Sequence, residues 1–148
     1  MKQIPNNLFF AWVEKEIAEG RSVQFRLKGV SMYPLIREGK DEVLLSPCSH
    51  TDLHPMDVIL FKYNGRHLLH RIIRSDGHFL YIQGDGSVIA KEKCLYTDVV
   101  GKVEAVIRPS GKRISINNWR WQLPSFIWTK SGIFRTLLLK TVFRYKWL

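Results

Sequence analysis

The chain has 148 residues, of which 45% are hydrophobic and 24% are charged. These values are ordinary for one globular domain with a hydrophobic core, and they exclude a disordered or low-complexity chain. The formal net charge of +10 is concentrated near the C-terminus, because residues 105–148 hold nine basic residues and no acidic one. A positively charged segment favours an anionic partner such as a phospholipid surface, nucleic acid or an acidic protein.

Residues 6–19 are expected to form a helix that docks on the edge of the body. Asn6 or Asn7 can cap its start, and Gly20 can end it. Phe10 broadens the apolar face, which leaves shallow contact with a membrane as the alternative. The apolar run here is six residues long and stops at Glu14, so the sequence predicts neither a signal peptide nor a transmembrane helix. The face that would dock consists of Leu8, Phe9, Trp12, Val13 and Ile17.

From Ser22 to Ile107 the chain is expected to consist mostly of short strands. Residues 23–27 alternate apolar and polar side chains, as a half-buried strand does. Asn64-Gly65 is a strong hairpin signal between two later apolar segments. The fold class we expect is mainly β, a coiled antiparallel sheet or small barrel with an N-terminal and a C-terminal helix. The further apolar segments lie at 42–45, 57–61, 67–73, 78–83 and 99–108.

The last segment is expected to form a basic amphipathic helix. Trp128 and Trp147 bracket it. Such a helix suits a membrane interface, although packing on its own domain with a solvated basic rim would explain the same pattern. One helical face is formed by Phe134, Leu137, Leu138, Thr141, Val142 and Tyr145. Outside this arc lie Arg135, Lys140, Arg144 and Lys146.

A tight turn after the first predicted strand carries a candidate nucleophile. Gly29 permits a bend there, and Pro34 stops the strand from continuing. Between them, Ser31 is a weak nucleophile that needs a base within hydrogen-bond reach. Without a base, Ser31 would only cap a short helical turn at residues 32–36. The backbone N–H of Ser31, with the turn at Gly29, is the simplest donor to an oxyanion.

A histidine in a later apolar strand is the candidate base. His70 lies in the segment Leu69-His70-Arg71-Ile72-Ile73, and imidazole is the side chain best suited to accept a proton near pH 7. A histidine on an apolar face can instead be a satisfied core residue. His67 would point to the opposite face and is the weaker candidate, and Arg71 is expected to be structural.

An aspartate in a glycine-flanked turn is the candidate orienting acid. Asp85, in Gly84-Asp85-Gly86, could bond the second ring nitrogen of His70 and fix its tautomer. It could also do no more than close its own turn. In that case the site would be a Ser-His dyad, with Glu92 as a more distant substitute.

These segments, in this order, resemble the S24/S26 superfamily of serine peptidases, which includes signal peptidase I and the LexA-like self-cleaving proteins. The resemblance runs from Gln24 to Ile107 and rests on the Gly-x-Ser-Met-x-Pro box and Gly84-Asp85. Most bacterial members use a lysine base, so the histidine here is similar to the branch typified by the signal peptidase of the endoplasmic reticulum. The matching boxes also include Leu35-Ile36, Gly39 and Met56-Asp57-Val58-Ile59.

The resemblance implies a serine endopeptidase that binds an extended substrate segment as an added strand beside the Ser31 strand. The leader of a secreted or modified peptide would suit it. Tyr33 stands where the family usually has glutamate, which bears on specificity. The implied catalytic residues are Ser31, His70 and Asp85, and the implied oxyanion and substrate-binding residues are Gly29, Met32, Tyr33 and Pro34.

Two other functions fit parts of the sequence. Self-cleaving repressors use lysine and cut an Ala-Gly or Cys-Gly bond, and the chain contains neither dipeptide. A catalytically silent peptidase-like protein would instead use the tail to hold membrane or nucleic acid. Nucleic acid is the less favoured partner, because helical periodicity explains the basic and aromatic residues of the tail more simply than base stacking does.

The sequence divides into an N-terminal docking helix at 1–21, an S24/S26-like peptidase body at 22–110 and a basic amphipathic extension at 111–148. We expect a cytoplasmic protein, with peripheral membrane contact through residues 119–148 as an option. The histidines show no metal-ligand spacing and no phosphate-binding motif is present, so neither metal nor cofactor is expected. Cys48 and Cys94 are expected to be idle thiols, or a single bridge if the chain is exported.

Overall fold

The structure is a computed structural model that describes residues 6–88 and 90–146. Eight strands within these residues form one antiparallel sheet in the order β1-β2-β7-β3-β4-β5-β6, with β8 paired to β7. The mainly β, antiparallel class expected from the sequence is therefore confirmed. The described strands leave the sheet open between β1 and β6, so it does not close into a barrel. The strands are β1 (Val23–Arg26), β2 (Glu42–Ser46), β3 (Val58–Tyr63), β4 (Arg66–Ser75), β5 (Phe79–Gln83), β6 (Glu92–Leu95), β7 (Val99–Ile107) and β8 (Arg113–Ser115).

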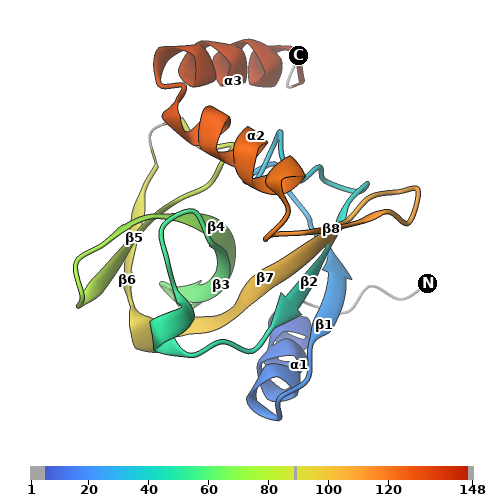
Figure 1. Cartoon of the computed structure of the whole chain (residues 1–148), viewed down its shortest axis with the longest axis vertical. Helices are drawn as coiled ribbons and strands as arrows, with labels where there is room; N and C mark the ends of the chain where they lie inside the picture. The colour runs from blue at the N-terminus through green and yellow to red at the C-terminus, as the bar shows by residue number, and fades with distance from the viewer. Residues whose placement is uncertain (1–5, 89, 147–148) are drawn as a thin grey trace.

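Three α-helices flank this sheet. Figure 1 shows α2 (Trp119–Lys130) between the sheet and α3 (Ile133–Lys146), and α1 (Asn6–Ala18) at the other end of the molecule. Two 3₁₀ turns, His50–Asp52 and Tyr96–Asp98, lead toward strands β3 and β7. None of the helices in the described part of the chain has the length and apolar character needed to cross a bilayer.

The expected strands are present, and their ends differ by a few residues from those predicted. The hairpin at Asn64-Gly65 is also confirmed, and both residues have the positive φ that such a turn requires. Two strands were missed. β6 is four residues long and begins with two charged residues, and β8 is three residues long, so neither has a clear apolar pattern. Because β8 pairs with β7, the sheet continues past the boundary predicted at residue 110.

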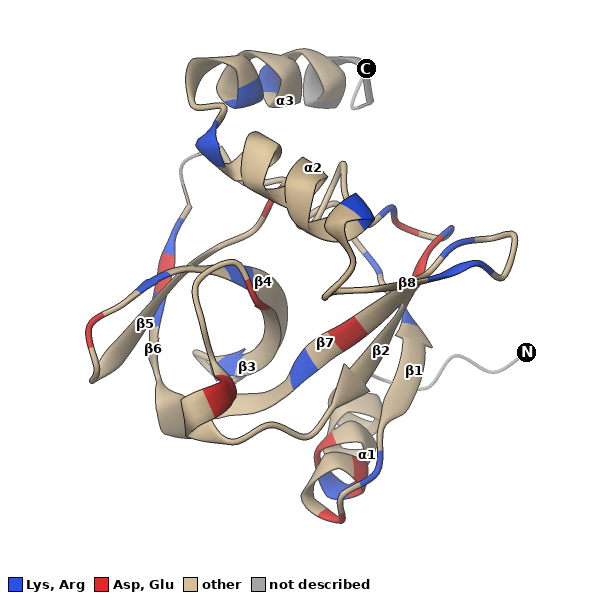
Figure 2. Ribbon diagram, viewed as in Figure 1, with Lys and Arg blue, Asp and Glu red and all other residues tan. Residues whose placement is uncertain are grey.

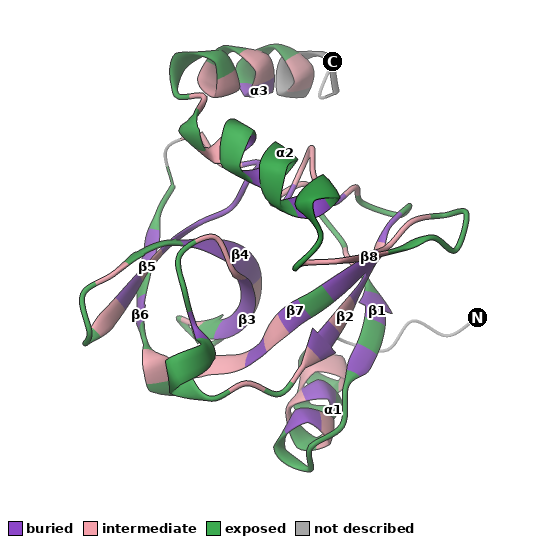
Figure 3. Ribbon diagram, viewed as in Figure 1, coloured by how far each residue is buried: buried purple, intermediate pink, exposed green. Residues whose placement is uncertain are grey.

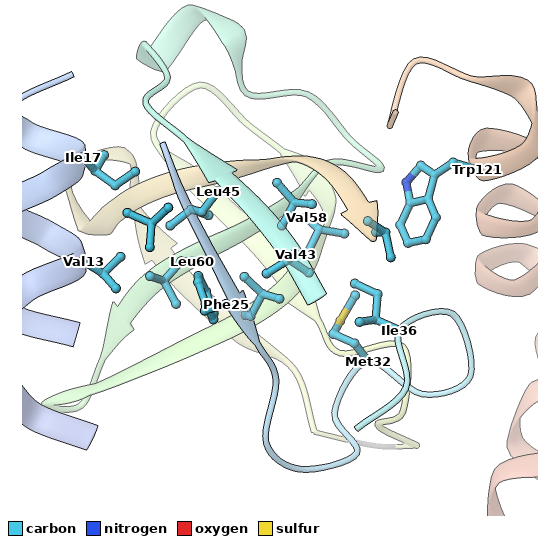
Figure 4. Packing of buried hydrophobic residues seen from close by; sticks show 14 residues of the cluster. Val13, Ile17, Phe25, Met32, Ile36, Val43, Leu45, Val58, Leu60 and Trp121 are labelled. Carbon is cyan, nitrogen blue, oxygen red and sulfur yellow. The ribbon is translucent and has the colours of Figure 1, made fainter. Parts of the chain in front are cut away.

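Two hydrophobic clusters lie on opposite faces of the strands β3 and β4. The first contains residues of α1, β1, β2 and β7, and it reaches Trp121 of α2. In Figure 4, Val13 and Ile17 of α1 lie at one end of this cluster, and Met32, Ile36 and Trp121 lie at the other. The second cluster is built from β3, β4, β5 and β6 and has as its members Leu53, Ile59, Phe61, Ile72, Leu80, Ile82 and Cys94.

The N-terminal helix docks on the body as predicted, but with a rotated face. Val13 and Ile17 are buried, and Phe10 packs against the first cluster, whereas Leu8 and Trp12 are exposed. The ring of His67 stacks on Phe10 with centroids 4.8 Å apart. His67 therefore serves the contact between β4 and α1, on the opposite face of the strand from His70, as expected.

The C-terminal segment forms two helices, where one was predicted, and the chain turns between them at Gly132, which has a φ of +55°. Only part of the apolar face predicted for the second helix packs on the body, because Phe134 and Leu137 are 64% and 60% exposed, whereas Leu138 and Val142 are half-buried. Leu139 is buried and Arg135 is half-buried, so these two positions turn toward the protein. The side chain of Tyr145 and the whole of Trp147 lie outside the described part.

Candidate active site

Ser31 follows β1 at a bend that Gly29 makes possible, because Gly29 has a φ of +85°, a value that other residues rarely adopt. In the helical turn that comes next, the backbone oxygen of Met32 accepts the N–H of Ile36 at 3.0 Å. Both side chains are 1% exposed and anchor the turn in the first cluster. Ser31 is left half-buried at the surface of the core. Its hydroxyl makes no hydrogen bond to any residue that the structure describes, so it does not cap the turn.

The four residues predicted to form the oxyanion and substrate site fall in different environments. Gly29 is exposed, and Tyr33 and Pro34 are half-buried and joined by a cis peptide bond. The side chain of Met32 is 1% exposed and belongs to the core, so only the backbone of this residue can face a substrate. The backbone N–H of Ser31 donates to no described group and remains available to an oxyanion.

The loop after β5 brings Ser31 to His70. The N–H of Gly86 donates to the backbone oxygen of Ser31 at 2.8 Å. A Cβ atom on Gly84 would lie 2.5 Å from that same oxygen and 3.0 Å from both Cδ2 of His70 and Oγ of Ser87. Only glycine leaves room at this position, because real Cβ atoms do not approach a backbone oxygen so closely. Ser31, His70 and Ser87 therefore converge on one point of the loop, although the sequence separates them widely.

His70 lies in β4 opposite Ile59 of β3 and is 7% exposed. Its ring packs edge-on against Phe61, with centroids 6.0 Å apart, on the face of the second cluster. Nδ1 is hydrogen-bonded to Oε1 of Glu92, the first residue of β6, which is itself buried. With Glu92 ionised, Nδ1 carries the proton and donates, and Nε2 keeps the lone pair that a general base needs.

The contact predicted between Asp85 and His70 is not formed. The Asp85 carboxylate instead accepts two hydrogen bonds from Arg71, at 2.9 Å from Nε and 2.8 Å from Nη2. Alternation along β4 turns Arg71 to the face opposite His70, where Arg71 is 0% exposed and Asp85 is 2% exposed. A buried guanidinium requires an anionic partner, and Asp85 supplies it. Arg71 is structural, as predicted, and the acid beside the histidine is Glu92, which sequence reasoning had ranked as a distant substitute.

The C-terminal helices hold the loop that joins Ser31 to His70. The indole N–H of Trp128 donates to the backbone oxygen of Asp85 at 2.9 Å. Arg135 donates to the backbone oxygens of Gly84 and Ser87, at 2.7 and 2.9 Å. Burial lowers the pKa of Arg135, and the positive charge of Arg71 acts in the same direction against the attraction of Asp85. The sequence predicted only that Arg135 lies outside the apolar arc of the helix. Its hydrogen bonds to carbonyls some fifty residues earlier could not be predicted from a local pattern.

A cavity among the described residues lies away from this site. Its volume is about 660 Å³, and it lies between α2 and the face of β4 that carries Arg71. Neither Ser31 nor His70 lines it. Within the described residues, no cluster of three or more histidine, cysteine, aspartate or glutamate side chains could hold a metal ion. Both Cys48 and Cys94 are free thiols.

Comparison with known proteins does not assign the chain to a family. No protein-family model matches the chain, and a search of curated proteins finds no match.

Proposed function

We propose that this chain is a serine endopeptidase of the S24/S26 type, in which Ser31 is the nucleophile, His70 is the general base and Glu92 orients the histidine. The observation that carries the proposal is the convergence at Gly84, where the backbone of Ser31 and the ring edge of His70 both lie within 3.0 Å of one Cβ position. A serine, a histidine and a buried carboxylate from three separate segments then form the arrangement that nucleophilic catalysis needs.

The chemistry proceeds as acyl transfer. Nε2 of His70 takes the proton of the Ser31 hydroxyl while Oγ attacks the scissile carbonyl carbon, and the N–H of Ser31 stabilises the oxyanion that forms. His70 then gives the proton to the leaving amine, and water hydrolyses the acyl-enzyme by the same steps. The Ser31 hydroxyl must turn toward Nε2 when substrate binds, as catalytic hydrogen bonds commonly tighten only in the bound state.

The edge of β4 beside His70 supports the binding of an extended substrate. Among the described strands, residues 66–70 of β4 pair with β3 alone, and pairing with β5 begins at Arg71. β1, which leads to Ser31, is itself the terminal strand of the sheet. An unpaired strand edge next to a base and a nucleophile is suited to adding a peptide as a further strand. A peptide leader with small side chains before the cut is the substrate class that we favour.

The test is covalent labelling with a serine-acylating penem, read by intact mass across pH 5 to 9. We expect one adduct on the wild-type chain and none on Ser31→Ala or His70→Ala. Ser87→Ala is the matched control, because the Ser87 hydroxyl approaches the same point at Gly84. Labelling that is lost in Ser87→Ala and kept in Ser31→Ala would overturn the assignment of the nucleophile.

A catalytically silent binding protein is the second candidate. The observation that favours it is the large exposed apolar face of α2 and α3, which no step of peptide hydrolysis uses. A folded wild-type chain that stays unlabelled at every pH would support this candidate.

A further inference from the structure

The C-terminal helices present an apolar face to solvent. Helix α2 buries Trp121, Ser125 and Trp128 on its inner side and carries further apolar side chains on its outer side. The body covers only this inner side of α2, and the outer side exposes apolar side chains next to the charges of Arg120 and Lys130. Figure 3 shows exposed residues along the outer sides of both helices. The large apolar residues that the two helices expose are each at least 49% accessible, namely Trp119, Leu123, Phe126 and Ile127 on α2 and Ile133, Phe134 and Leu137 on α3.

The orientation of this face is fixed from inside. Trp128 is hydrogen-bonded to the backbone of Asp85, and Arg135 is hydrogen-bonded to the loop at Gly84 and Ser87. Leu139 is 0% exposed. These three inward contacts prevent either helix from rotating its apolar side chains onto the body. The face defined by the seven exposed residues therefore remains uncovered, although Trp119, Leu123 and Phe126 also line the cavity beside Arg71. An exposed apolar patch of this kind marks an interaction site.

The charges around the face decide what can cover it. Arg120, Lys130 and Lys140 are exposed on the same two helices. Residues 105–148 contain no acidic residue, and Figure 2 shows blue but no red on α2 and α3. The surface that covers this face must therefore be apolar in part and anionic in part.

Of the available partners, an anionic membrane meets both requirements. A second copy of the chain would bring like charges together across a symmetric interface. Nucleic acid would meet the charges and its bases could stack on the three rings of the face, but it would leave the four aliphatic side chains, namely Leu123, Ile127, Ile133 and Leu137, without an apolar partner. Phospholipid supplies acyl chains for the apolar residues and anionic headgroups for the cations.

We propose that the face formed by the seven exposed residues of α2 and α3 docks on the surface of an anionic phospholipid membrane. The two helices lie in the plane of the interface, with their apolar side chains at the boundary between headgroups and acyl chains. Docking does not depend on whether Ser31 is catalytic. If the proposed peptidase function holds as well, Arg135 and Trp128 connect the membrane-bound helices directly to the loop that carries Gly84, and cleavage takes place next to the membrane.

Vesicle co-sedimentation of the full chain tests this proposal. Phosphatidylcholine vesicles are compared with vesicles of phosphatidylcholine and phosphatidylglycerol, at low and high salt. We expect binding to the anionic vesicles that weakens as salt rises. Penem labelling of the same samples is scored separately, so that failure of docking and failure of catalysis are distinguished.

Variants locate the contact. The double change Leu123→Ser with Phe126→Ser should weaken binding by about a hundredfold, since each substitution removes one side chain from the interface. Leu8→Ser with Leu95→Ser is the matched control, because both leucines are similarly exposed but lie outside α2 and α3. Lys130→Gln should weaken binding by about fivefold, and Lys15→Gln, on α1, should not. All variants should melt at the wild-type temperature, because the changed side chains are exposed.

Four outcomes would overturn the proposal. They are absence of binding to anionic vesicles at low salt, equal losses in the α2 variants and their controls, dimerisation abolished by the Leu123 and Phe126 changes, and binding of single-stranded nucleic acid without binding of vesicles. The third would assign the face to a second copy of the chain, and the fourth would assign it to nucleic acid.

Discussion

The imidazole Nδ1 of His70 is hydrogen-bonded to the Glu92 carboxylate, across 22 residues of sequence. β5 separates the two residues along the chain, and the pairing of β6 with β5 returns Glu92 to the ring. In the proposed mechanism, the carboxylate both holds the ring and stabilises its protonated form.

If the proposed mechanism holds, we expect Glu92→Gln to lower the rate of acylation by about 10³ to 10⁴, as loss of the orienting carboxylate does in a Ser-His-Asp triad. Stopped-flow labelling with the penem, with and without the change, measures this rate. Asp85→Asn is the comparison variant. It should chiefly lower the free energy of unfolding, by about 3–5 kcal/mol, because it leaves the Arg71 charge buried without its partner. A variant pair with the opposite behaviour would restore Asp85 as the orienting acid.

Gly86→Ala should disrupt the loop that joins Ser31 to His70. A Cβ atom there would lie 2.0 Å from the backbone oxygen of Val30, and a backbone atom cannot move aside as a side-chain end can. We expect loss of penem labelling together with a lower melting temperature. Gly111→Asn is the control, because a Cβ atom at Gly111 meets nothing within 4 Å and asparagine tolerates a positive φ. If Gly86→Ala is labelled as fast as the wild-type chain, the close approach of the loop at Gly86 to the segment at Val30 would be contradicted.

Arg135→Lys should loosen the loop at residues 83–87 without unfolding the protein. Lysine keeps the charge but cannot donate to several carbonyls from one planar group as arginine does. We expect faster amide hydrogen exchange in this loop and a lower acylation rate, by about tenfold. Arg66→Lys, at the exposed start of β4, is the matched control and should change neither quantity. Unchanged exchange in Arg135→Lys would show that Arg135 does not position the loop.

Asp41 should make stability depend on pH at the acid end. Burial raises the pKa of its carboxyl, but hydrogen bonds from Arg37 and the charge of Arg108 outweigh burial and leave the pKa lowered. Because the folded pKa lies below the unfolded value of about 3.9, the stabilisation is present above that pH and is lost as pH falls through the folded pKa. Asp41→Asn should cost about 3 kcal/mol near neutral pH, and urea unfolding should show this difference shrinking below pH 4. A difference that is constant with pH would contradict the assignment.

Local sequence determined most of the secondary structure. Alternation fixed β1, the Asn64-Gly65 pair fixed the hairpin between β3 and β4, and helical spacing fixed α1 and α3, because each of these signals acts between residues close in the chain. The same reasoning located Ser31 and His70 as candidates. It also predicted that His67 and Arg71 would turn away from His70, which follows from the two-residue period of a strand.

Only the tertiary structure decided which groups meet. Asp85 and Glu92 are both carboxylates downstream of His70, and the sequence favoured Asp85 because it lies in a recognisable turn. Asp85 forms an ion pair with the buried Arg71, and the register of β6 on β5 brings Glu92 to His70. In the same way, a helical pattern shows that α3 has an apolar side, but hydrogen bonds from Arg135 to distant carbonyls turn that side outward. Contacts between segments far apart in the chain set both outcomes, and no periodicity within one segment encodes them.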